Sequence, residues 1–62
     1  MTDNEMIEAL LDIVDDTRTE TPDRTEALVV RGYAAKKGRR SFRPTNAGWN
    51  LLGERGRQFD VD

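Results

Sequence analysis

Five cationic side chains within eight consecutive positions are the residues of this chain best suited to binding chemistry. They are Lys36, Lys37, Arg39, Arg40 and Arg43. Ammonium and guanidinium groups at this density bind phosphate oxygens, and arginine favours the concentrated negative potential of a narrow DNA minor groove. The same pattern also occurs on hairpin edges, where charge keeps a strand soluble and unpaired. A third use is contact with an acidic protein, including a second copy of this chain, and the sequence leaves all three uses open.

Catalytic chemistry has little support in the composition. The chain has no Cys and no His, so a structural zinc site and a Ser-His or Cys-His catalytic unit cannot be built from it alone. The acids of the first 20 residues are spread along one predicted helix, without a pocket that would raise a carboxyl pKa. We therefore predict a protein that is not an enzyme and that uses no metal ion or cofactor.

The net charge of −2 hides an uneven distribution of charged residues. Residues 1–20 hold seven acids and one Arg, a charge of −6. Residues 21–43 hold two acids and seven bases (+5), and residues 44–62 hold three acids and two bases (−1). The middle of the chain is thus the part that would meet a polyanion.

The length of 62 residues predicts a single domain that buries only about 60% of the surface its unfolded chain exposes. A core of this size rarely supplies more than about 3 to 5 kcal/mol, so self-association into a homodimer is one way to bury more apolar surface. The longest apolar runs are four residues, far below the roughly 18 needed to span a bilayer. We expect a cytoplasmic protein with no membrane contact.

The first helix is predicted to start at Thr2, because Thr2-Asp3-Asn4-Glu5 fits a capping box. The helix should continue for about 12 to 15 residues, with its apolar side chains within a sector of about 160°. Those side chains are Met6, Ile7, Leu10, Leu11, Ile13 and Val14. The opposite face is acidic and most simply solvated, although Asp12, Asp15 and Asp16 could hold a cation weakly or meet a basic partner.

A second helix is predicted over residues 22–31. Thr21 is its expected N-cap, Pro22 its first residue and Gly32 its C-terminal stop in the left-handed conformation. Apolar residues 27–30 would point all round such a helix, so a buried strand through this run is the alternative.

A two-stranded hairpin is predicted from residues 33–37 and 41–43, with Gly38 at positive φ in the turn. Tyr33, Ala35 and Phe42 are expected on its inner face. Pro44 cannot donate to the strand ladder and should end the second strand.

A third helix is predicted over residues 46–55, capped by Thr45 and stopped by Gly56. Trp49 and Leu52 should face the core. Residues 57–62 are expected to be a tail that need not be ordered. The predicted fold is α+β, in the order helix, helix, β-hairpin, helix.

Two short motifs flank the hairpin. Leu28, Gly32 and Tyr33 lead into it, and Thr45, Gly48, Leu51 and Leu52 follow it. On these residues the segment 27–52 resembles the recognition helix, wing and following helix of winged helix-turn-helix transcription regulators of the multiple-antibiotic-resistance and PadR types. The chain departs from that pattern in having two helices before the hairpin rather than three, and Pro44 where an aliphatic residue is usual.

The resemblance implies a small winged-helix-like domain in which helix 22–31 approaches the DNA major groove and the hairpin is the wing. With the cationic cluster, it predicts a small DNA-binding regulator of transcription that contacts double-stranded DNA, as a dimer. The residues expected to contact nucleic acid are Arg24, Arg31, Lys36, Lys37, Arg39, Arg40 and Arg43. The alternative is a protein-interaction or dimerisation module that uses the same scaffold without DNA.

Overall fold

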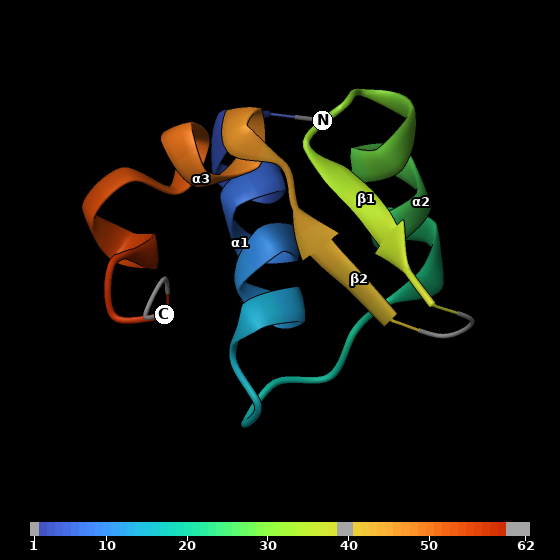
Figure 1. The fold of residues 1–62 in the computed structure, drawn as a ribbon, viewed down its shortest axis with the longest axis horizontal. Helices are drawn as coiled ribbons and strands as arrows, with labels where there is room; N and C mark the ends of the chain where they lie inside the picture. The colour runs from blue at the N-terminus through green and yellow to red at the C-terminus, as the bar shows by residue number, and fades with distance from the viewer. Residues whose placement is uncertain (1, 39–40, 60–62) are drawn as a thin grey trace.

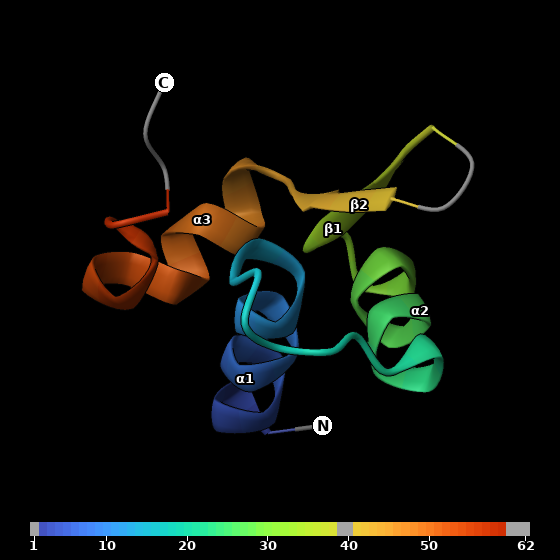
Figure 2. The ribbon, with the colours of Figure 1, turned by 90° about the horizontal axis from the view of Figure 1, so that it is seen from below.

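The computed structural model describes residues 2–38 and 41–59. The elements are α1 (Asp3–Val14), α2 (Pro22–Val30), β1 (Ala34–Lys37), β2 (Ser41–Pro44), α3 (Asn46–Leu52) and the 3₁₀ helix η1 (Gly53–Gly56). Their order confirms the predicted α+β arrangement. Figures 1 and 2 show two layers, with α1 and α2 in one and the hairpin and α3 in the other. We call these the helical layer and the outer layer.

Helix α1 begins as the sequence predicts and provides the centre of the core. The Thr2 hydroxyl accepts a hydrogen bond from the Glu5 amide (3.2 Å), and the Glu5 carboxylate accepts one from the Thr2 amide (3.1 Å). Leu10 is fully enclosed, because α2, β2 and α3 all contact α1. The core therefore forms around one side of the most amphipathic segment of the chain.

The core draws one or more side chains from four elements. Its buried apolar residues are Met6, Ala9, Leu10, Leu11, Leu28, Ala34 and Leu52. Trp49 packs against this cluster and is partly buried, which agrees with the predicted inward position of Trp49 and Leu52. Phe59 packs against it too, so the part of the predicted tail that the structure describes is attached to the core.

Residues 22–30 form a helix rather than the alternative strand. Leu28 anchors α2 in the core, and Gly32, at φ 81°, turns the chain out of the helix as predicted. Thr21 is the N-cap residue, as predicted, but its hydroxyl makes no capping hydrogen bond. Pro22 instead starts the helix with a backbone angle that already suits it.

The hairpin pairs Ala34 with Pro44, Ala35 with Arg43, Lys36 with Phe42 and Lys37 with Ser41. Gly38 has φ 76°, as predicted for the turn, and Pro44 is the last residue of β2. The predicted inner position of Ala35 is wrong, because cross-strand partners share a face and Phe42 faces inward with Lys36. Ala34, two residues from Lys36, is the buried alanine.

Helix α3 docks on the turn that joins α2 to β1. The Thr45 hydroxyl caps α3 by accepting from the Gly48 amide (3.2 Å) and donates to the Gly32 carbonyl (2.6 Å). The Thr45 amide donates to the Tyr33 carbonyl (3.0 Å). A Cβ on Gly48 would overlap that carbonyl oxygen. The two motifs that flank the hairpin in the sequence are therefore in direct contact.

Helix α3 ends at Leu52, three residues before the predicted end. Gly53, at φ 57°, stops the helix, and η1 follows. Gly56, which the sequence suggested as the stop, is buried, and a Cβ there would lie 2.8 Å from Leu52 Cβ. The chain needs glycine at 56 for close packing and at 53 for the turn.

Candidate nucleic-acid interface

The two layers differ in charge. Residues 3–26, which form α1, the connector and most of α2, hold nine acids and two Arg, a charge of −7. Residues 27–53, which contain the end of α2, the hairpin and α3, hold six cations and no acid (+6). Residues 54–62 hold three acids and two Arg (−1), which completes the net charge of −2. An acid-free segment thus builds the outer layer.

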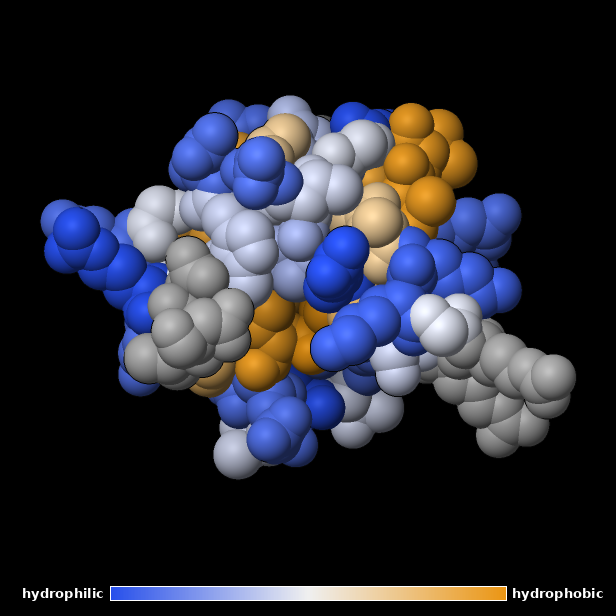
Figure 3. Space-filling view, in the orientation of Figure 1, coloured by the Kyte–Doolittle hydropathy of each residue, from blue (hydrophilic) through white to orange (hydrophobic). Residues whose placement is uncertain are grey.

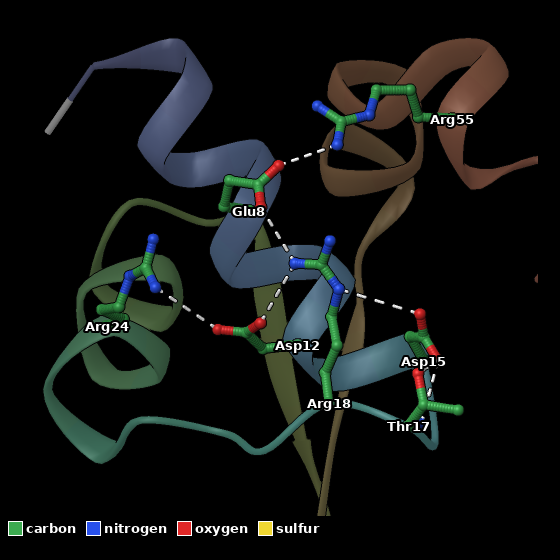
Figure 4. Close-up of polar contacts among 7 residues, drawn as sticks. All are labelled: Glu8, Asp12, Asp15, Thr17, Arg18, Arg24 and Arg55. Carbon is green, nitrogen blue, oxygen red and sulfur yellow. Dashed lines mark hydrogen bonds and ion pairs between the residues drawn. The ribbon is translucent and has the colours of Figure 1, made fainter.

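Arginines from three other parts of the chain pair with the acidic face of α1 (Figure 4). Arg18 of the connector lies 2.9 Å from Glu8, 3.4 Å from Asp12 and 3.7 Å from Asp15. Arg24 of α2 lies 3.5 Å from Asp12, and Arg55 of η1 lies 2.7 Å from Glu8. The expectation of a simply solvated face is corrected, because these carboxylates tie the connector, α2 and η1 to α1.

Two of these carboxyl groups, those of Glu8 and Asp15, have lowered pKa values in the folded protein. Hydrogen bonds from Arg18 and Arg55 hold the pKa of the Glu8 carboxyl below its ordinary value. The Thr17 hydroxyl and amide lower the pKa of Asp15 in the same way. Among the residues that the structure describes, no group of three or more acids is placed to hold a metal ion. These carboxylates act as partners for arginine.

The predicted DNA-contacting cations fall into different environments. Arg24 is engaged by Asp12, and exposed Arg31 donates to the Ala27 carbonyl at 3.4 Å. On the hairpin, Lys37 and Arg43 point outward and Lys36 points toward α2, and all three are exposed. Within residues 2–38 and 41–59, no carboxylate forms an ion pair with these three cations. Arg39 and Arg40 lie outside the described residues.

Two exposed asparagines lie on α3, the helix that follows the hairpin. Gly48 of α3 faces the Tyr33 carbonyl, Pro44 and Leu10, which an added Cβ would meet. Asn46 and Asn50 stand two positions before and after Gly48, about 200° around the helix, so they point away from α1, and both are exposed. The sequence-based prediction did not include Asn46 and Asn50. Their spacing of four residues around Gly48 was the available signal, because it places both on the helix face opposite the glycine.

The outer layer's exposed side is mostly polar. Figure 3 views it directly: one apolar patch lies near the middle of the view, and another gathers at the corner beside the C-terminal end of α2. There Val30 is 78% exposed and Val29 37%. A groove of about 530 Å³ runs between α2 and the inner side of the hairpin. Its lining mixes apolar, acidic and basic side chains: Glu20, Pro22, Thr25, Glu26, Val29, Lys36 and Phe42.

Comparison of the chain with protein-family models, with curated proteins and with solved structures gave no match. In the described part of the chain, no helix has the length and apolar character needed to cross a bilayer.

Proposed function

We propose that this chain is a small cytoplasmic DNA-binding domain that contacts the phosphate backbone of double-stranded DNA through its hairpin. One observation carries the proposal. The cations divide into two groups, because Arg18, Arg24 and Arg55 are held by the acids of α1. Lys37 and Arg43 stand exposed on the outer layer, where no described carboxylate pairs with them.

The position of these cations suits a polyanion. They lie on one strand pair, and the sequence adds Arg39 and Arg40 in the segment that connects the strands. Cations that contact phosphates release counterions from DNA, so affinity falls as salt rises. Three to five phosphate contacts would lower log K by about 3 to 4.5 for each log unit of salt.

The winged-helix resemblance supports the same role. The flanking motifs imply a hairpin between the end of a short helix and a capped helix. Thr45 hydrogen-bonds to Gly32 and Tyr33, and Gly48 packs against the Tyr33 carbonyl, so the two motifs together hold α3 against the turn before the hairpin. A regulator of transcription with the hairpin as its wing is the function we infer for the domain.

The proposal is tested by fluorescence anisotropy with a duplex of about 20 base pairs between 50 and 200 mM salt. Lys36→Ala/Lys37→Ala removes one cation from each face of β1. We expect binding to weaken about tenfold or more at the low-salt end, with a salt slope reduced by about 0.9 to 1.8.

Arg55→Ala/Arg57→Ala is the matched control, since it removes the same charge at η1. It should change affinity by less than about threefold at 0.15 M salt, where charges more than roughly 8 Å away are screened. The proposal fails if the wild-type protein shows no salt-sensitive binding, or if the control weakens binding as much as the hairpin variant.

A second candidate function is a protein-interaction or dimerisation module. It is favoured by Val29 and Val30, two neighbouring apolar side chains exposed at one end of α2. Light scattering coupled to size exclusion tests it with Val30→Ser. A dimer that dissociates on this change while DNA binding persists would show that both functions coexist. A wild-type monomer removes the self-association candidate.

A further inference from the structure

We infer that the duplex lies across the outward side of the outer layer, where Asn46 and Asn50 of α3 extend the site of Lys37 and Arg43, and that α2 stays out of the DNA grooves. We call these four residues the outer face. The ligand is the phosphate backbone of double-stranded DNA of any sequence. The inference rests on the DNA-binding function proposed above and names the surface that performs it.

The hairpin fixes half of the outer face. Ala34 and Pro44 are paired and both are buried against the helices. Side chains alternate along a strand, so the next pair, Ala35 and Arg43, points outward. Lys37 is two residues from Ala35 and is exposed on the same side. Two positively charged groups therefore stand on the side of the hairpin that faces away from α1 and α2.

Helix α3 fixes the other half. Gly48 faces inward, so Asn46 and Asn50 face outward, and Asn46 follows Arg43 after only Pro44 and Thr45. Figure 2 shows α3 and the hairpin in the same layer. Asparagine amides donate hydrogen bonds to phosphate oxygens and bring no charge of their own. The four side chains thus offer two charged and two neutral donors within residues 27–53, a segment whose sequence contains no acid.

Helix α2 is unsuited to the role of a recognition helix. Its exposed positions include Asp23 and Glu26, which repel phosphates, and Val29 and Val30, which carry no side-chain donor. Its Arg24 is turned to Asp12. On the inner side of the hairpin, Lys36 shares a groove with Glu20 and Glu26, so its charge is partly balanced there.

Sequence-independent binding of duplexes follows from this placement. The charged half of the outer face lies on a hairpin whose cations would contact phosphates, and phosphate contacts carry no sequence information. The aromatic residues Tyr33, Phe42 and Trp49 are partly buried and do not offer stacking platforms for single-stranded bases. We expect two unrelated duplexes of equal length to bind alike, and both to bind more tightly than a single strand because of their higher charge density.

The experiment compares four variants by anisotropy on two unrelated duplexes and one single strand, with folding checked by circular dichroism. Lys37→Ala/Arg43→Ala should weaken binding about tenfold or more and reduce the salt slope by about 1.8. Asn46→Ala/Asn50→Ala should weaken it about threefold to tenfold at an unchanged slope, because hydrogen bonds are lost but no charge. Asn4→Ala on α1, an exposed asparagine of the helical layer, is the matched control and should have no effect.

The remaining variant is Asp23→Asn/Glu26→Gln, which neutralises the exposed acids of α2. At 0.15 M salt these changes should alter affinity by less than about threefold, because α2 lies in the other layer and its charges are screened. A gain above tenfold together with an unaffected asparagine variant would place α2 against DNA and overturn the inference while the proposed function stands. Preference for one duplex by more than tenfold would also overturn it. Absence of binding by the wild-type protein would remove the proposed function itself.

Discussion

Replacement of Gly48 by Ala tests the docking of α3. Helix propensity predicts that this change raises the free energy of unfolding, whereas packing predicts that it lowers it. In an exposed helix, Ala is more favourable than Gly by about 1 kcal/mol. Here a Cβ would overlap the Tyr33 carbonyl oxygen and would lie 3.1 Å from Pro44 Cβ and 3.2 Å from Leu10 Cδ2. The oxygen belongs to the backbone, so it cannot rotate away as a flexible side chain would.

Relief of the overlap requires α3 to move away from the turn between α2 and β1. That movement breaks the hydrogen bonds from the Thr45 amide to Tyr33 and from the Thr45 hydroxyl to Gly32. Two such bonds are worth about 1 kcal/mol each, and overpacking adds about 1 to 3 kcal/mol. After the gain in propensity, the expected net loss is about 2 to 4 kcal/mol, most of the roughly 3 to 5 kcal/mol available to a domain of this size.

The assay is thermal and urea unfolding followed by far-ultraviolet circular dichroism. We expect Gly48→Ala to lower the midpoint temperature by at least about 10 °C. Asn50→Ala, at an exposed position of the same helix, is the control and should leave the midpoint unchanged or slightly higher. If Gly48→Ala melts at or above the wild-type temperature, the close approach of α3 to Tyr33 is refuted.

Two further predictions concern stability. Thr45→Ala should lower the free energy of unfolding by about 1 to 2 kcal/mol in urea titrations, because the cap and the bond to Gly32 are lost, and Thr45→Ser should restore most of it; equal losses in both variants would contradict the role of the hydroxyl. Thermal stability should be constant above about pH 5 and fall below it. Glu5, Glu8 and Asp15 have pKa values lowered from 4.5, 4.5 and 3.8 by hydrogen bonds in the folded protein, so their stabilisation is complete above those unfolded values and is lost as the pH falls through the folded ones. A midpoint temperature that does not decrease between pH 5 and pH 3 would contradict this.

Signals that act over a few residues predicted most of the fold. The capping box at Thr2 and Glu5, the left-handed glycines at 32 and 38, and the cap at Thr45 each depend on neighbours within about four positions, and each is present. Local signals were insufficient at the end of α3, where either of two glycines could end the helix. Gly53 and Gly56 both suit a helix stop, and only the packing of Gly56 against Leu52 decides between them.

The register of the hairpin shows a second limit. Whether Ala34 or Ala35 faces the core depends on which residue opposes Phe42, and the structure pairs Phe42 with Lys36. A shift of one residue reverses the face of every side chain in β1.

The candidate site could be predicted only in part, because the ion pairs that engage some of its cations join residues far apart in the sequence. The density of cations between residues 36 and 43 is visible in the sequence, but the pairing that engages Arg24 joins residues twelve positions apart. Arg55 reaches Glu8 across 47 positions. Such pairs follow from the fold and separate structural arginines from exposed cations, which composition alone cannot do.

The most direct measurement is a two-dimensional amide NMR titration of the labelled protein with a short DNA duplex at low salt. We predict that the largest chemical-shift changes fall between residues 35 and 50 on the outer layer, including the side-chain amides of Asn46 and Asn50. Changes centred on Asp23 and Glu26 of α2, or no change at all in the outer layer, would contradict it.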